Sequence, residues 1–204
     1  IELYREYKKQ NRPKEEFLIA AAKIPGVYVP SLYTITYHDD GTVKAITPKC
    51  GAPETIKKRV MMDMDKSYFP DKFVVPYIEI VHDRTVAEVL RGCIRGCRFC
   101  QAGFLYRPFR EKSVGVIDKQ CHDLCDNTGY DEISLSSLST SDYSQINELL
   151  DQLLTWTKAE KTGVSLPSLR VDNFSTELMS KIKSVRRSGL TFAPEAGTQR
   201  LRDV

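Results

Sequence analysis

Three cysteines lie within one short stretch, Cys93-Ile-Arg-Gly-Cys97-Arg-Phe-Cys100, with the spacing Cys-x3-Cys-x2-Cys. Thiolates are soft ligands that favour iron–sulfur clusters and zinc. Three thiolates on one tight loop can hold three corners of an iron–sulfur cube and leave the fourth iron open. An open iron can bind a small molecule, whereas a fully ligated cluster can only transfer electrons. The spacing therefore predicts a cluster with a free coordination position.

Two other uses of these thiols stay open. A structural zinc site needs a fourth ligand, and His82 or His122 could serve, although neither has a partner at zinc-finger spacing. A ferredoxin-type cluster needs a fourth cysteine at a short interval, but the next one is Cys121. Cys121 and Cys125 fall on the apolar face of a predicted helix and are expected to be small buried hydrophobes. A non-catalytic iron–sulfur or zinc-binding module is therefore the alternative to a cluster that binds a small molecule.

The composition of the chain limits the class of protein, the partners and the compartment in which this chemistry can occur. The 204 residues are 41% hydrophobic and 28% charged, as in an ordinary globular protein. Lys and Arg total 30 and Asp and Glu 27, so the net charge of +3 gives no electrostatic support for nucleic acid binding. The best apolar run, 17–22, is too short to cross a membrane. Clustered cysteines favour metal binding in a reducing compartment over disulfides, which predicts a cytoplasmic protein.

Residues 1–75 are expected to form a small α+β accessory region and linker, the tail of a preceding domain. A helix is predicted over 14–23, because Pro13 suits a first helical turn. Strands over 33–37 and 43–47 flank the turn 38–41 and predict a β-hairpin. A proline-punctuated connector follows over 48–76. The chain begins with Ile1 and stops inside a predicted helix, so we expect a piece of a longer protein.

Residues 76–204 alternate between strands and helices, which predicts βαβ units and a parallel sheet. Strands are predicted over 86–90, 132–138, 164–169 and 190–193. Helices are predicted over 114–127, 144–158, about 178–185 and from 198 onward, with Ser113 and Ser175 as N-caps and Gly129 and Gly189 as ends. Polar segments follow the strands at 91–100, 139–142, 170–173 and 195–198, at the sheet edge where parallel α/β folds bind ligands. The predicted fold class is α/β, a truncated partial (β/α) barrel with about four βα units.

The cysteine spacing, with Phe99 as the aromatic residue before Cys100, resembles the Cys-x3-Cys-x-aromatic-Cys signature of the radical S-adenosylmethionine (radical SAM) superfamily. The resemblance implies that Cys93, Cys97 and Cys100 hold a [4Fe-4S] cluster, whose open iron is chelated by S-adenosyl-L-methionine. It also implies that one electron from the cluster cleaves this cofactor to a 5′-deoxyadenosyl radical, which abstracts hydrogen from a substrate. The barrel would then be of the radical SAM type.

The resemblance assigns cofactor contacts at the strand ends. Phe99 would pack near the adenine. Ser139 begins a segment that holds the methionine amino group in relatives, although this chain lacks their Gly-Gly-Glu residues and the assignment is by position. Arg170 and Asp172 resemble a strand end that suits a carboxylate, with a structural ion pair as the alternative. Glu195 suits ribose hydroxyls or an ammonium group, with a helix N-terminal charge as the alternative.

The resemblance also gives roles to other residues of the cysteine loop. Gly96 and Gly103 would permit the tight path of the loop around the cluster. Arg95 and Arg98 would tune the potential of the cluster, with solvent-facing charge as the alternative.

Three segments, 91–108, 138–143 and 191–203, are similar to an uncharacterised bacterial radical SAM subfamily related to the methylthiotransferases. Its members carry a cobalamin-binding-like domain before the barrel. This chain has no Asp-x-His-x-x-Gly segment, so cobalamin is not predicted. The resemblance implies a reductant such as flavodoxin or ferredoxin, and a C-terminal barrel half and neighbouring domains outside this chain. RNA or a ribosomal component is the implied substrate, without support from charge.

Overall fold

The computed structural model describes residues 1–173, 175–184 and 192–203. The chain divides into two compact units, Ile1–Met61 and Met62–Val204. This division precedes the predicted boundary at residue 75, because the intervening segment packs with the second unit. Met64 is fully buried there, and the Asp65 carboxylate accepts a hydrogen bond from the Ser113 backbone N–H at 2.8 Å.

The first unit contains α1 (Glu2–Lys9), α2 (Lys14–Ala21) and the antiparallel hairpin of β1 (Tyr33–Tyr37) and β2 (Val43–Pro48). The predicted helix over 14–23 and the hairpin are confirmed, whereas the sequence pattern does not predict α1. The turn closes with a hydrogen bond from the His38 N–H to the Thr42 carbonyl at 2.8 Å. A small core beside the hairpin consists of Ala22, Val29, Leu32 and Tyr33.

The second unit is built on a parallel sheet in the order β3-β6-β7, from β3 (Thr85–Glu88), β6 (Glu132–Ser136) and β7 (Gly163–Ser165). The helix α4 (Val114–Thr128) connects β3 to β6, and α5 (Ile146–Glu160) connects β6 to β7. This confirms the predicted mixed α/β fold with a parallel sheet. The predicted strand over 164–169 is shorter than expected, because the chain leaves the sheet after Ser165.

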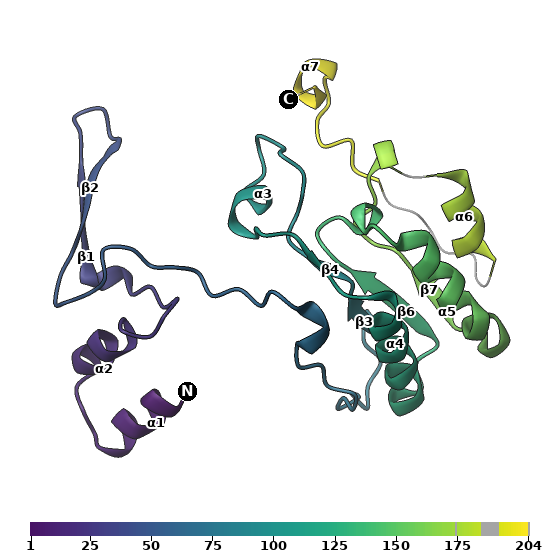
Figure 1. The fold of residues 1–204 in the computed structure, drawn as a ribbon, viewed down its shortest axis with the longest axis horizontal. Coiled ribbons are helices and arrows are strands. Elements are labelled where there is room, and N and C mark those ends of the chain that lie inside the picture. Colours follow the sequence, from purple (N-terminus) through teal and green to yellow (C-terminus); the bar gives the residue numbers. More distant parts are fainter. Residues whose placement is uncertain (174, 185–191, 204) are drawn as a thin grey trace. The chain divides into compact units, whose positions relative to one another are not determined.

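The helices of this unit form a neighbouring series along the sheet. The helix α4 packs on β3 and β6 and against α5, and α5 packs against α6 (Thr176–Lys183), as Figure 1 shows. The strands follow one another in the sheet in chain order. The main core joins the sheet to these helices, with the fully buried side chains Ala87, Val89, Ile117, Cys121, Ile133, Leu135, Leu149, Leu150 and Leu153.

The helix ends agree partly with the predicted caps. Gly129 ends α4 in the left-handed conformation at φ 74°, and the Ser175 hydroxyl accepts a hydrogen bond from the Leu178 N–H at 3.1 Å. Ser113 occupies the N-cap position of α4, but its side chain makes no capping hydrogen bond. The Asp65 carboxylate binds the N–H of this residue instead.

The predicted strand over 86–90 is divided. After β3, the short strand β4 (Leu90–Arg91) pairs antiparallel with β5 (Arg110–Glu111). This ladder closes the base of a loop over 92–109, which we call the cysteine loop and which contains the short helix α3 (Ala102–Leu105). The sequence pattern predicts neither the ladder nor α3.

The predicted fourth strand over 190–193 and the helix end at Gly189 fall largely on 185–191, outside the described residues. The described Phe192 and Ala193 are not in a strand, and α7 (Gln199–Arg202) follows with its N-cap at Thr198, near the predicted start. The closed or partial barrel therefore stays a prediction. Among residues 1–173, 175–184 and 192–203, no helix has the length and apolar character needed to span a membrane.

Candidate functional site

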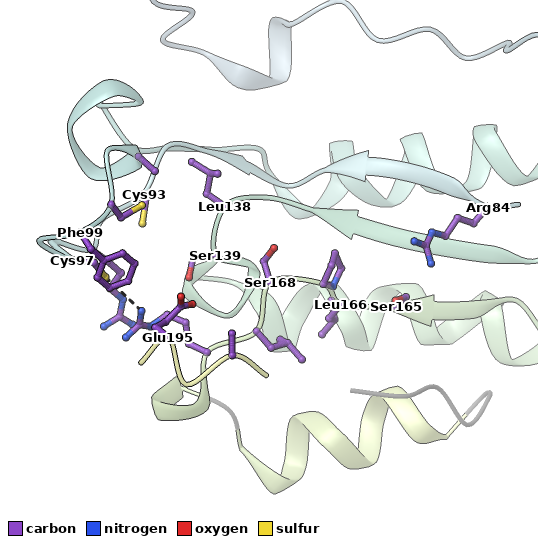
Figure 2. A pocket seen from close by; sticks show the side chains of 17 residues that line it. Arg84, Cys93, Cys97, Phe99, Leu138, Ser139, Ser165, Leu166, Ser168 and Glu195 are labelled. Carbon is purple, nitrogen blue, oxygen red and sulfur yellow. Dashed lines mark hydrogen bonds between the residues drawn. The ribbon is translucent and has the colours of Figure 1, made fainter. Parts of the chain in front are cut away.

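A pocket of about 660 Å³ lies in the second unit between the cysteine loop and the segments that follow β6 and β7. Its wall includes most of the site residues predicted from the sequence: Cys93, Cys97, Phe99, Cys100, Ser139, Arg170 and Glu195. Figure 2 shows Cys93, Cys97 and Phe99 at one end of the pocket, near Ser139 and Glu195, with Arg84 at the other end. Residues from five separate parts of the chain, at 84, 93–102, 138–139, 165–170 and 193–195, therefore share one cavity.

The three cysteines of this wall are free and half-buried. A turn brings Cys100 back toward Cys97, with a hydrogen bond from the Cys100 N–H to the Cys97 carbonyl at 3.0 Å. In the described part of the chain, no three His, Cys, Asp or Glu side chains converge closely enough to hold a single metal ion. The donor set thus consists of three thiols, none of them in a disulfide, on one pocket wall. Thiols are the ligands of iron–sulfur clusters, but these three are not close enough together to coordinate one metal ion.

Two glycines shape the cysteine loop. Gly92 has φ 101°, and a Cβ built on it would lie 2.6 Å from the Tyr106 carbonyl oxygen. A Cβ on Gly103 would collide with the Arg95 carbonyl oxygen. The predicted need for glycine therefore holds at Gly103, whereas Gly96 has open space around it and no unusual φ. The local sequence does not single out Gly92, because its need arises from contacts with residues at the far end of the loop.

Arg95 joins the cysteine loop to the end of β6. Its Nε donates to the Asp142 carboxylate at 2.8 Å, and its Nη2 donates to the other oxygen of the same carboxylate. The Ser139 hydroxyl donates to Asp142 at 2.7 Å. The Asp142 side chain is only 2% exposed. The ion pair raises the pKa of Arg95. Arg98, by contrast, is exposed, in keeping with the solvent-facing alternative.

Arg170 and Asp172 form a second ion pair after β7. Two nitrogens of Arg170 donate to the two carboxylate oxygens of Asp172 at 3.0 and 2.9 Å. The pair lowers the pKa of Asp172 and raises the pKa of Arg170. The Nη1 of Arg170 also lies 4.0 Å from the Cys97 sulfur. The structural ion pair is therefore present, and its guanidinium reaches a predicted cluster ligand as well; Asp172 itself does not line the pocket.

Two pocket residues after β7 have unusual backbone conformations. Ser168 has φ 59° and Glu195 has φ 67°, a region that non-glycine residues rarely occupy. Strained residues of this kind concentrate at ligand sites. Among the described residues that line the cavity, Glu195 is the acidic one, whereas Arg84, Arg95 and Arg170 are basic.

The other candidate ligands have different surroundings. His82 Nδ1 lies 3.1 Å from an Arg84 nitrogen, and His122 pairs with Asp126 along α4 at 3.1 Å. Cys121 and Cys125 are buried in the main core as predicted, and burial raises the pKa of both thiols. None of these four residues lines the pocket of the three cysteines.

No protein-family model matches this sequence. The chain is similar to an uncharacterized protein, MJ0966, of Methanocaldococcus jannaschii, with 28% identity over 175 residues. The match covers 80% of this chain and 37% of that protein, so the chain spans little more than a third of the relative's length. The function is therefore inferred from the site.

Proposed function

We propose that this chain is part of a radical SAM enzyme that binds a [4Fe-4S] cluster and S-adenosyl-L-methionine in the pocket of the cysteine loop. The observation that carries the proposal is the shared wall: three free thiols, an aromatic side chain and the ends of two parallel strands border one cavity of about 660 Å³. The arrangement of the helices also supports a partial barrel of the radical SAM type. In a (β/α) barrel, consecutive strands are neighbours and consecutive helices pack in one outer layer, as β3, β6 and β7 and α4, α5 and α6 do.

The proposed ligands are Cys93, Cys97 and Cys100. When bound, the reduced cluster would supply the electron that cleaves the sulfonium of S-adenosyl-L-methionine. The chain would bind and orient both groups. Arg170 is close enough to Cys97 to donate to its thiolate, and this contact would disperse the negative charge of an anionic cluster.

The remaining wall suits the polar and aromatic parts of the cofactor. Phe99 is exposed on the pocket wall and offers a ring on which a base can pack. Glu195 can accept hydrogen bonds from ribose hydroxyls or an ammonium group. The hydroxyl of Ser139 is already donated to Asp142. Its contact with the methionine part is therefore proposed through its remaining lone pairs.

Anaerobic reconstitution tests the proposal. Iron and sulfide should each reach about four per chain, and dithionite should then produce 5′-deoxyadenosine from S-adenosyl-L-methionine. Cys97→Ala should abolish the cluster, and Cys121→Ala is the matched control because its thiol is buried away from the pocket. Tight zinc binding without iron–sulfur absorption would refute the proposal and favour the zinc-binding module.

Substrate, localisation and partners extend the proposal beyond this chain. We propose a cytoplasmic enzyme that receives its electron from a flavodoxin or ferredoxin. RNA or a ribosomal component is the proposed substrate class. Production of 5′-deoxyadenosine by the longer protein should increase when its substrate is added, which can be measured with RNA and ribosomes in turn.

A further inference from the structure

The cysteine loop makes a bidentate long-range polar contact, between Arg95 and Asp142, that ordinary loop geometry does not explain. Weaker long-range contacts also reach the loop, from Arg170 to the Cys97 sulfur at 4.0 Å and from Asp172 to Arg95 at 3.8 Å. Arg95 lies between two of the cysteines, and its partner Asp142 follows β6, 47 residues later in the chain. Both carboxylate oxygens of Asp142 accept from the same guanidinium. Such a bidentate pair fixes distance and orientation together.

The surroundings of the pair favour a positioning role over a surface ion pair. The Asp142 side chain is 2% exposed and that of Arg95 is 32% exposed. Exposed pairs contribute little because water and salt screen them, whereas removing one partner of a buried pair leaves an uncompensated charge. The third acceptor contact of Asp142, with the Ser139 hydroxyl, fixes the carboxylate to its own segment. The hydrogen bond from Ser139 therefore orients the Asp142 carboxylate toward Arg95 of the loop.

The same contacts separate Asp142 from direct ligand binding. Its oxygens are occupied by Arg95 and Ser139, and its side chain does not line the pocket. Glu195, in contrast, lies on the pocket wall. Two acidic residues near the predicted cofactor thus have different surroundings: one faces the loop arginine and the other faces the cavity.

We propose that Arg95 and Asp142 are positioning residues that hold the cysteine loop in the conformation in which its three thiols face the pocket. The inference rests on the proposed function for its purpose, the placement of cluster ligands, but the contact itself exists without a cluster. Opening of the pair removes the bidentate link between the loop and the segment that follows β6, while β4 and β5 still close the base of the loop.

The test uses hydrogen exchange of backbone amides, followed by mass spectrometry, in the cluster-free 204-residue chain. Asp142→Asn and Arg95→Ala should each raise exchange in the loop peptide at least tenfold and leave exchange in α4 unchanged. The double variant Arg95→Ala with Asp142→Asn should raise it no further than the larger single effect, because the two residues act as one unit.

Glu88 and Arg91 provide a matched control. They form a bidentate pair at 2.9 and 2.6 Å at the start of the same loop, but the two residues are only three apart in the chain, on the consecutive strands β3 and β4, and the pair does not link the loop to the segment after β6. Glu88→Gln should therefore leave loop exchange within about twofold of the wild type. Equal loop exchange in Asp142→Asn and Glu88→Gln, or a rise in α4 as large as that in the loop, would overturn the proposal.

Cluster assembly is measured separately on the same variants. If the wild type incorporates iron and sulfide, Asp142→Asn should retain less than a third of its content. If the wild type incorporates none, the proposed function fails, whereas the exchange result still decides whether the pair positions the loop.

Discussion

Gly92→Ala adds a single methyl group, and the structure predicts a large loss of stability from it. The φ of 101° at this position is a conformation that costs a non-glycine residue about 1–3 kcal/mol. The added methyl group would also lie 2.6 Å from the Tyr106 carbonyl oxygen and 3.1 Å from both Phe109 Cα and the Pro108 carbonyl oxygen. These atoms belong to the backbone and cannot rotate away, so overpacking adds about 1–3 kcal/mol. We expect a total destabilisation of about 2–6 kcal/mol, the sum of the two costs.

Urea unfolding measures this effect. Trp156 is the single tryptophan of the chain and packs on the core of the second unit, so its fluorescence reports on the unit that contains the loop. With a urea dependence of about 2 kcal/mol per M, the midpoint should fall by about 1–3 M. Gly96→Ala is the control in the same loop, because a methyl group added there would meet no atom within 4 Å and the φ of Gly96 is not positive.

The control should change stability by less than about 1 kcal/mol, since alanine also restricts the unfolded chain. A midpoint for Gly92→Ala equal to that of Gly96→Ala would refute the reasoning, because it would mean that the loop base relaxes without cost.

Two further predictions concern the stability of the second unit. Asp65→Ala should destabilise the second unit by about 1 kcal/mol, because the Asp65 carboxylate caps α4. Ser113→Ala should cost less than about 0.5 kcal/mol, because the Ser113 side chain makes no capping hydrogen bond. Urea unfolding compares the two variants, and a larger loss of stability in Ser113→Ala would contradict the assignment of the cap. Burial raises the pKa of Tyr143 to about 12 from an ordinary value near 10, so the stability due to its neutral form is complete below about pH 10 and is lost as pH rises through 12. Tyr143→Phe should lower stability at pH 7 by about 1 kcal/mol, because the Lys112 carbonyl loses a hydrogen bond of 2.8 Å. The same variant should lose less stability between pH 10 and pH 12 than the wild type in urea unfolding. An unchanged loss of stability over this pH range would contradict the assignment to this tyrosine.

The long elements of the second unit are predictable because their apolar residues recur with a clear period. The helix α5 carries Leu149, Leu150, Leu153 and Leu154 on one face, and all four are buried. The strand β6 is buried at three consecutive positions, as expected for a parallel strand. In these elements local pattern and tertiary packing agree, so the pattern alone indicates the structure.

The elements at the site are too short for this reasoning. The strands β4 and β5 have two residues each, and α3 has four, so no periodicity can appear in them. Their structure depends on contacts between the two ends of the loop, which a local pattern does not record. The pattern over 86–90 therefore predicts one continuous strand, although the chain turns toward β5 at its end.

The spacing of cysteines identifies a chemistry, but it does not say what holds the thiols in place. Arg91 and Arg95 each lie two residues from Cys93 and are equivalent as charges near a loop. Arg91 pairs with Glu88, its near neighbour in sequence, whereas Arg95 pairs with a carboxylate 47 residues away. The first pair can form wherever the chain turns, but the second can form only when the loop and the end of β6 have come together. Because the Asp142 carboxylate is buried, loss of Arg95 would leave its negative charge without a partner and out of reach of water. The positioning contact is thus a product of the parallel sheet, which brings the ends of neighbouring strands to one edge, and it requires the fold before it can support the site.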